Sequence, residues 1–391
     1  MASEGSTVLA ERARPEAAAE APAKVSPPSS PAQGRLVSLD TFRGFIMFWI
    51  VGGTGLAAGL HALWPNGLLD TLTYELNHTD WVGLRFYDLI WPSFMLMVGV
   101  SIPLAFAKRA RTQTYPEILG HALLRFAVLF LLGSLRESIH KGAPYWVELS
   151  SALQPIAVAY LAAFLLVRKS QRVQAAVAGL IYVAYGLILA FVSAPGVPAG
   201  SYEPGVNLVR YIDIRLLGRT FPVTDAWGTI ICTLPTISTT IIGMIIGEWL
   251  MSARSKDDKV KMLAGTGFLC LAAGYSLSLI VPMIMKIWTV SYGLTATGWA
   301  CVMFLLFYWL IDIRGYRKGS LFFVVIGSNA VFIYMFSSIV PLRQWVGIFF
   351  GHGVARHAGP HAASLPAAIV VMTVEWLMLF WMYRNKIFIK A

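Results

Sequence analysis

Long apolar segments separated by short polar connections dominate the sequence after residue 34. A helix needs about 20 consecutive apolar residues to cross the hydrocarbon core of a bilayer. Ten segments of about that length follow one another, near residues 40–60, 87–107, 116–135, 149–167, 173–193, 227–251, 261–285, 292–312, 320–340 and 366–383. This pattern predicts an all-α, polytopic membrane protein with about ten transmembrane helices, which form one domain over residues 35–391.

Residues 1–34 differ from the rest of the chain in being rich in Ala, Pro, Glu and Ser. They contain no apolar core long enough for a signal peptide. Such a composition cannot bury enough apolar surface to offset the entropy of ordering the chain. We therefore expect a disordered, cytoplasmic N-terminal tail.

Composition narrows the class of protein further. The 391 residues are 57% hydrophobic and only 13% charged, and the mean hydropathy is +0.65, which excludes a soluble globular domain. The net charge of the chain is +11. In a membrane protein an excess of Lys and Arg marks the cytoplasmic loops, so this charge does not indicate a nucleic-acid partner. Three isolated cysteines within apolar segments predict neither a disulfide framework nor a metal site.

Basic residues in the connections predict the orientation of the helices, because Lys and Arg near helix ends are retained in the cytoplasm. Alternate short connections and the C-terminal end carry sixteen of them, at 108, 109, 111, 168, 169, 172, 254, 256, 259, 261, 314, 317, 318, 384, 386 and 390, against nine in the opposite, longer loops. We expect both termini to be cytoplasmic, and residue 78 to lie on the outer side.

Three ionisable residues lie within or at the edge of apolar segments. Asp40 and Arg43 stand where the first segment enters the membrane, and Arg125 lies well inside the third. Charged groups at these depths require a partner or water. Asp40 and Arg43 can serve a functional site, or they can form an interfacial ion pair whose arginine reaches the headgroups.

His78 is the main candidate for chemistry, since the chain has no nucleophile elbow, P-loop or dinucleotide motif. An imidazole with an ordinary pKa of about 6.5 can take a proton from an acceptor or carry an acyl group, although a histidine in a polar loop can also be merely solvated. Asp88 can cap the next helix or hold the tautomer of His78. Asn329 and Tyr334, at near i, i+4 spacing on one expected helix, suit either a site or ordinary interhelical hydrogen bonds.

Several motifs carry a resemblance to a known family. RLVSLDTFRG at 35–44, HTDWVGLRFYDLIWP at 78–92 and VGVSIP at 98–103 resemble the start of the transmembrane acyltransferase domain found in heparan-α-glucosaminide N-acetyltransferases and their bacterial relatives. YIDIRLLG at 211–218, GSNAVFIYMF at 327–336 and YRNKIFIK at 383–390 follow in the same order. The resemblance covers residues 35–391.

This resemblance implies an acetyl-CoA-dependent acyltransferase in a bacterial inner membrane. The protein would move an acetyl or other acyl group from cytoplasmic acyl-CoA to the amine or hydroxyl of an amino sugar or glycan at the outer face, without a metal. The implied catalytic residues are His78, Asp88 and Asp40. The phosphates of coenzyme A suit bidentate arginine donors, so Arg43, Arg35 and Arg125 are expected to contact acyl-CoA. Asn329 is a further expected contact of acyl-CoA. Membrane lipids are expected partners, nucleic acid is not, and a homodimer remains an option.

Two departures from the family pattern keep other functions open. Thr54 stands where relatives commonly have an acidic residue or asparagine. Pro155 follows a Leu-Gln pair at the position where the sugar N-acetyltransferases of the family have an arginine. The acceptor can therefore differ from heparan glucosamine, or the chain can have lost activity. A sugar or amphiphile transporter is the alternative from another class, because buried polar residues on kinked helices also serve permeation. Thiol release from acetyl-CoA distinguishes the acyltransferase hypothesis from the transporter hypothesis.

Overall fold

A computed structural model describes residues 36–218, 227–348 and 364–389, which are helical and carry no β-sheet. The chain from Leu36 onward forms one compact unit. The expected disordered tail and Arg35 lie outside the described residues.

Eight helical segments among the described residues are long and apolar enough to cross a membrane, which makes the protein a multi-pass membrane protein. The first is α1 (Val37–Phe48), which continues through a π-helical turn at Trp49–Gly53 into α2 (Thr54–Leu63). The others are a 3-10 turn (Phe86–Leu89) with α4 (Ile90–Arg109), α5 (Tyr115–Lys141), α7 (Gln171–Phe191), α9 (Thr233–Met251), α10 (Lys256–Ser278), α11 (Val290–Tyr308) with a π-helical turn (Trp309–Ile313), and α15 (Ser364–Arg384).

Two further apolar segments bring the observed helices close to the predicted ten. The helix α6 (Leu153–Leu165) has 13 residues, so at 1.5 Å per residue it is only about 20 Å long and too short to span alone. The pair α12 (Ser320–Ser328) and α13 (Ala330–Ile339) is bent by 73°. The break falls at Asn329, so the expectation that Asn329 and Tyr334 share one helix is wrong.

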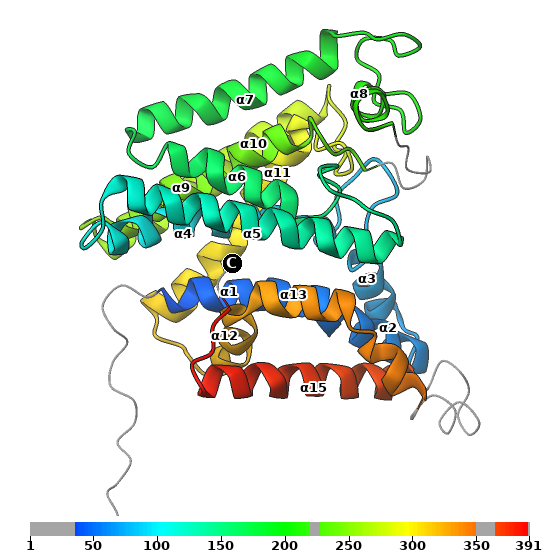
Figure 1. Cartoon of the computed structure of the whole chain (residues 1–391), viewed down its shortest axis with the longest axis vertical. Coiled ribbons are helices and arrows are strands. Elements are labelled where there is room, and N and C mark those ends of the chain that lie inside the picture. Colours follow the sequence, from blue (N-terminus) through cyan, green and yellow to red (C-terminus); the bar gives the residue numbers. More distant parts are fainter. Residues whose placement is uncertain (1–35, 219–226, 349–363, 390–391) are drawn as a thin grey trace, which may run out of the picture. The chain divides into compact units, whose positions relative to one another are not determined.

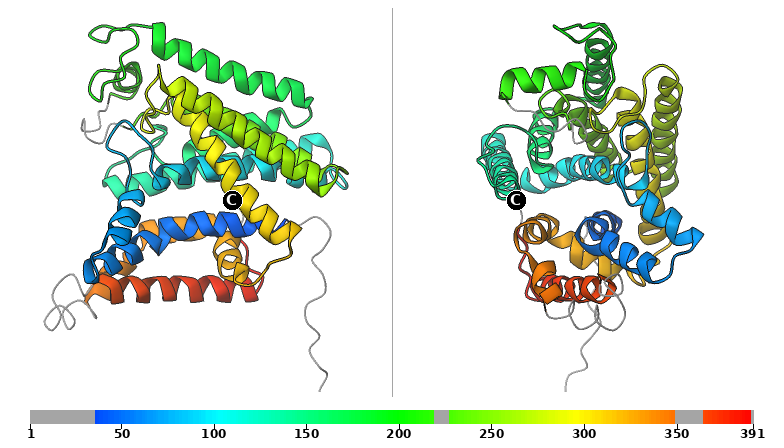
Figure 2. Two further views of the ribbon diagram at one scale, coloured as in Figure 1. Left: turned by 180° about the vertical axis from the view of Figure 1, so that it is seen from behind. Right: turned by 90° about the vertical axis from the view of Figure 1, so that its right-hand side faces the viewer.

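The helices pack in two groups, which Figures 1 and 2 show from three sides. One group contains α4, α5, α6, α7, α9, α10 and α11. The other contains α1, α12, α13 and α15, whose shared core includes Met47, Ile326, Ile333 and Leu379. Phe42 and Ile46 of α1 pack with Leu96 and Phe304 and so join the first helix to the other group.

Glycines allow α4 and α9 to approach closely. A Cβ added to Gly243 would meet the carbonyl oxygen of Leu96, and one added to Gly99 would meet that of Thr240. Small residues at helix contacts are the usual device for close packing in membranes. This contact holds α4, which follows the histidine loop, against the centre of the bundle.

The connections rich in Lys and Arg all lie at one end of the bundle of long helices. They join α4 to α5, α6 to α7, α9 to α10 and α11 to α12, and a further group follows α15. We call this the basic end. The short helices α3 (Gly67–Glu75) and α8 (Leu208–Leu217) belong to connections at the opposite end, which also carries the loop with His78.

Candidate active site

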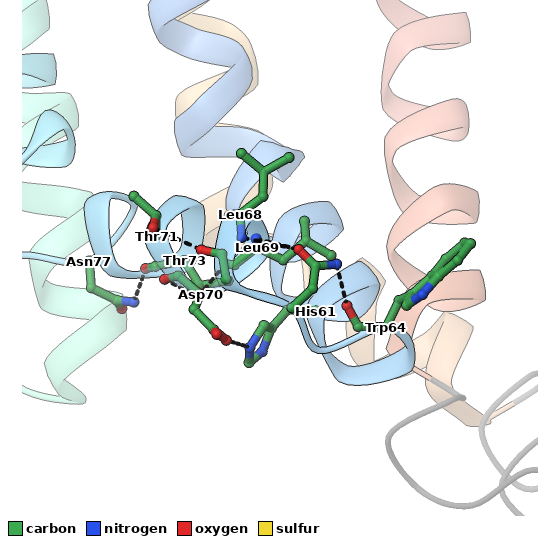
Figure 3. Close-up of polar contacts among 10 residues, drawn as sticks. His61, Trp64, Leu68, Leu69, Asp70, Thr71, Thr73 and Asn77 are labelled. Atoms are coloured by element: carbon green, nitrogen blue, oxygen red, sulfur yellow. Dashed lines mark hydrogen bonds and ion pairs between the residues drawn. The ribbon is translucent and has the colours of Figure 1, made fainter.

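A short helical hairpin precedes His78 and holds its backbone. Asn66 caps α3 by accepting hydrogen bonds from the backbone N–H groups of Leu68 and Leu69, both at 3.1 Å, as expected for an asparagine N-cap. Nε2 of His61 lies 2.6 Å from Oδ1 of Asp70 and links α2 to α3, as Figure 3 shows. Asn77, the residue before His78, donates to the carbonyl oxygen of Thr73 at 2.6 Å.

His78 and Asp88 form a hydrogen-bonded pair. Nδ1 of His78 lies 2.8 Å from Oδ1 of Asp88, and the Asp88 side chain is 0% exposed while that of His78 is 40% exposed. A carboxylate can only accept, so the proton of a neutral imidazole lies on Nδ1 and the lone pair on Nε2. The arrangement thus supplies one potential base that solvent or a substrate can reach.

Other donors to Asp88 make its burial tolerable. Oδ2 accepts hydrogen bonds from Oγ1 of Thr79 at 2.9 Å and from the backbone N–H groups of Arg85 at 3.0 Å and Thr79 at 3.4 Å. A buried charge is costly unless it is paired and hydrogen-bonded. The bond to Arg85 caps the 3-10 turn that begins α4, so Asp88 makes both contacts considered from the sequence, the helix cap and the contact with His78.

Aromatic rings and backbone contacts fix the imidazole plane and its loop. The ring of Tyr87 lies 4.7 Å and that of Trp227 lies 5.3 Å from the ring of His78, both edge to face. Arg85 Nη1 donates to the carbonyl oxygen of His78 at 2.8 Å. The backbone N–H of Gly83 donates to the carbonyl oxygen of Met283 at 2.9 Å, and Gly83 has φ of 130°, which other residues rarely adopt. The histidine loop is therefore held against the connection between α10 and α11.

Asp213 of α8 supports the segment that carries Trp227. Its two carboxylate oxygens accept from the backbone N–H groups of Thr229 at 2.9 Å and Ile230 at 3.1 Å. Burial raises the pKa of the Asp213 carboxyl above its ordinary value, against the opposing effect of these hydrogen bonds. Asp213 thereby holds the backbone directly after Trp227, the residue whose ring contacts His78.

Asp40 and Arg43 lie toward the basic end, far from His78. Nη1 of Arg43 lies 3.3 Å from Oδ1 of Asp40, and its Nη2 donates to Oγ of Ser101 at 3.0 Å. Ser101 is 13 residues beyond Asp88 along the helix that Asp88 caps, which corresponds to roughly 20 Å. The structure therefore brings Asp40 together with Arg43 and Ser101, and not with the histidine.

The other expected acyl-CoA contacts are dispersed. The guanidinium of Arg125 stacks 4.6 Å from the ring centre of Tyr160, and its buried Nε has no hydrogen-bond partner among the described residues. The amide of Asn329 donates to the carbonyl oxygen of Ile387 at 3.0 Å and accepts from the N–H of Ile389 at 2.9 Å. Asn329 thus anchors the C-terminal segment to the break between α12 and α13. No cluster of three or more His, Cys, Asp or Glu suited to a metal ion occurs within the described ranges.

Both departures from the family pattern lie within helices. Thr54 begins α2, directly after the π-helical turn. Pro155 is the third residue of α6, where a missing backbone N–H costs little. Its neighbour Gln154 donates to Oγ of Ser134 at 3.1 Å, so the first turn of α6 is held without an arginine at position 155.

Sequence reasoning missed several residues around the histidine. Thr79 and Arg85 lie within the same motif and could have been suggested by their polar character. Trp227 and Asp213 are more than a hundred positions away, and no local pattern connects them to His78. Tyr292, whose hydroxyl donates to the carbonyl oxygen of Asp88 at 2.7 Å, lies in an apolar segment and resembles an ordinary core residue.

Comparison with known proteins agrees with the resemblance of the motifs. The chain is 25% identical over 423 residues to heparan-alpha-glucosaminide N-acetyltransferase of Homo sapiens and 22% identical over 426 residues to the protein of that name of Mus musculus. Each match covers 91% of this chain and 60% of the relative, so the chain spans about three fifths of the length of these relatives. No family model matches the sequence. The chain is thus distantly related to heparan-alpha-glucosaminide N-acetyltransferases.

Proposed function

We propose that this distant relative of heparan-alpha-glucosaminide N-acetyltransferases is itself a transmembrane acyltransferase. It takes an acetyl or other acyl group from acyl-CoA and delivers it to the amine or hydroxyl of a sugar. The observation that carries the proposal is the contact of 2.8 Å between the half-exposed His78 and the fully buried Asp88. Such a pair offers a base whose orientation is fixed before substrate arrives.

The reaction follows from the lone pair on Nε2 of His78, since Nδ1 carries the proton that faces Asp88. The imidazole accepts a proton from the attacking amine or hydroxyl, the new C–N or C–O bond forms at the thioester carbonyl, and the C–S bond breaks. The imidazolium then returns the proton to the leaving thiolate. Asp88 stabilises the positive charge that develops on the ring between these two steps. Attack by His78 itself, to give an acyl-histidine, uses the same two residues and remains the alternative.

The donor approaches from the basic end in this proposal. Arg43 is the first candidate to bind the phosphates of coenzyme A, because its guanidinium lies at that end and already makes polar contacts with Asp40 and Ser101. Asp40 then orients Arg43 and takes no part in proton transfer. Arg125 is a second candidate, since its buried Nε has no hydrogen-bond partner in the part of the chain that the structure describes. We assign Asn329 an anchoring role.

The orientation in the membrane is part of the proposal. The concentration of Lys and Arg at one end of the long helices supports a cytoplasmic basic end. In this proposed orientation both termini lie in the cytoplasm, and the His78 loop lies at the outer face of a bacterial inner membrane. Acyl-CoA is a cytoplasmic compound, so the acyl group would cross the membrane during the reaction.

A transfer assay tests the function. Purified protein in liposomes is given radiolabelled acetyl-CoA with glucosamine, and both labelled N-acetyl product and free thiol are measured. We expect both to form with wild type and to be lost in His78→Ala. Label retained on wild-type protein without acceptor, and absent from His78→Ala, would select the acyl-histidine route. Binding of sugar with no thiol release would contradict the proposal in favour of a transporter.

A further inference from the structure

A large apolar cavity adjoins the histidine loop and has no role in the chemistry described so far. Its volume is about 860 Å³, within the range of about 300 to 1,000 Å³ usual for ligand pockets. Phe45, Met303, Leu306 and Phe307 are among the side chains that line it, whereas Arg85 and Glu75 contribute polar groups. His78 itself does not line the cavity. Arg85, which does line it, donates a hydrogen bond to the carbonyl oxygen of His78.

The polar and apolar walls lie at different depths. Arg85, Glu75 and Pro282 belong to the connections at the His78 end. From Trp299 to Phe307 the cavity follows α11 for eight residues toward the basic end, which corresponds to about 12 Å. The two charged side chains that line the cavity, Glu75 and Arg85, thus lie where it meets the histidine loop, and its wall along α11 is largely apolar.

Exposed apolar residues at its edge show where the cavity opens. Leu306 of α11 is 54% exposed and Tyr275 of α10 is 45% exposed, and both line the cavity. These helices are membrane-spanning segments, so their exposed apolar faces lie against lipid chains. A molecule already dissolved in the bilayer can therefore enter sideways.

We infer that the cavity binds the alkyl chain of an amphiphilic acceptor whose amino-sugar or hydroxy-sugar head lies at Glu75 and Arg85, next to His78. This inference rests on the proposed function and specifies its acceptor class as a glycolipid of the outer leaflet. Within the described ranges, the buried Nε of Arg85 has no hydrogen-bond partner. Its Nη1 donates to the carbonyl oxygen of His78, and its guanidinium stacks on the ring of Tyr74. The Glu75 carboxylate accepts from the N–H of Phe86 at 2.8 Å and can accept further bonds from a hydroxyl or ammonium.

Two other occupants fit the walls less well. The pantetheine arm of coenzyme A carries amide groups, and burying an amide without a hydrogen-bond partner is unfavourable. A free sugar has the same difficulty along Phe45, Met303 and Phe307. An alkyl chain needs no polar partner, and a polar head at the mouth would have Glu75 and Arg85. The distribution of wall chemistry therefore favours an amphiphile.

Paired acceptors test the inference directly. Octyl glucosaminide and glucosamine share a head and differ in the chain, so the ratio of their kcat/KM values measures what the chain contributes. We expect a ratio of at least ten in wild type, because a chain held in the cavity positions the head beside His78. Met303→Trp, which puts a bulky ring on the apolar wall where the chain would lie, should lower this ratio at least tenfold. Leu269→Trp, at an exposed position of α10 outside the cavity lining, should leave it unchanged.

A photoactivatable alkyl glucosaminide separates failure of this inference from failure of the proposed function. Added without acetyl-CoA, it should label residues 299–307 in wild type and lose this labelling in Met303→Trp. Labelling of the cavity without any acetyl transfer would keep the amphiphile site and overturn the acyltransferase. Labelling spread evenly over the lipid-facing helices, or loss of acetyl-CoA binding in Met303→Trp, would overturn the amphiphile site and leave the acyltransferase standing.

Discussion

Asp88 holds Nδ1 of His78 at 2.8 Å from a carboxylate that is entirely buried, while the histidine side chain itself remains partly exposed. The same carboxylate accepts from Thr79 and from the backbone of Arg85. These bonds prevent Asp88 from following a moving imidazole. The pair therefore combines a fixed proton acceptor on one nitrogen with an accessible lone pair on the other, which is the requirement for general base catalysis.

Replacing Asp88 by Asn should impair turnover without removing the site. An asparagine amide can donate to Nδ1 and so favour the tautomer that carries its proton on Nε2. In that tautomer Nε2 has no lone pair and cannot act as a base. We expect kcat to fall by roughly 10²-fold or more, with the affinity for acetyl-CoA little changed. The measurement is steady-state acetyl transfer alongside calorimetric binding. Thr79→Val serves as a control that removes one bond to Asp88 but leaves the tautomer intact, and it should lose much less activity.

Replacing Arg43 by Ala should act on the donor. A charge-assisted hydrogen bond contributes about 1.5 to 3 kcal/mol, so the dissociation constant for acetyl-CoA should rise by roughly 10- to 100-fold. Arg384→Ala, at the end of α15 on the same side of the bundle, is the matched control and should bind normally. Equal losses in both variants would point to a general effect of surface charge and would remove Arg43 from the donor site.

Cysteine labelling should establish the orientation. Leu68 of α3 is 80% exposed and Ala253 is an exposed residue at the basic end. In intact cells an impermeant thiol reagent should modify Leu68→Cys and spare Ala253→Cys until the membrane is opened. The native thiols Cys232, Cys270 and Cys301 are all buried, so background labelling should be low. The reverse pattern would place the histidine loop in the cytoplasm.

The sign of the pKa shift at Asp213 predicts a pH dependence. Burial raises the pKa of this carboxyl above its ordinary 3.8, so between that value and the raised one the folded protein binds more protons than the unfolded chain. Stability should therefore fall as pH rises through this interval. In thermal unfolding of detergent-solubilised protein, the wild-type Tm should decline relative to that of Asp213→Asn from pH 4 upward and level off above the raised pKa. A difference in Tm that does not change with pH would contradict the assignment.

The features that could be predicted are those determined by residues close to one another in the sequence. Hydrophobic runs located the long helices, and His78 and Asp88 belong to one motif because they are only ten positions apart. The bend at Asn329 was missed because an uninterrupted apolar run does not show that the amide of Asn329 binds the distant Ile387 and Ile389. The family resemblance implied a catalytic role for Asp40, but the resemblance does not show that Asp40 and His78 lie near opposite ends of the long helices. Trp227 and Asp213 depend on contacts between distant segments, which a single sequence does not reveal.

Acetyl transfer by His78→Ala is the most direct test of the central claim that Nε2 of His78 is the catalytic base. General base catalysis contributes about 10²- to 10⁴-fold, so turnover with acetyl-CoA and an amino-sugar acceptor should fall by that factor. Acetyl-CoA binding, measured on the same preparation, should remain close to that of wild type because the imidazole does not bind the phosphates. A His78→Ala protein that transfers acetyl groups at the wild-type rate would contradict the account and make His78 a solvated loop residue.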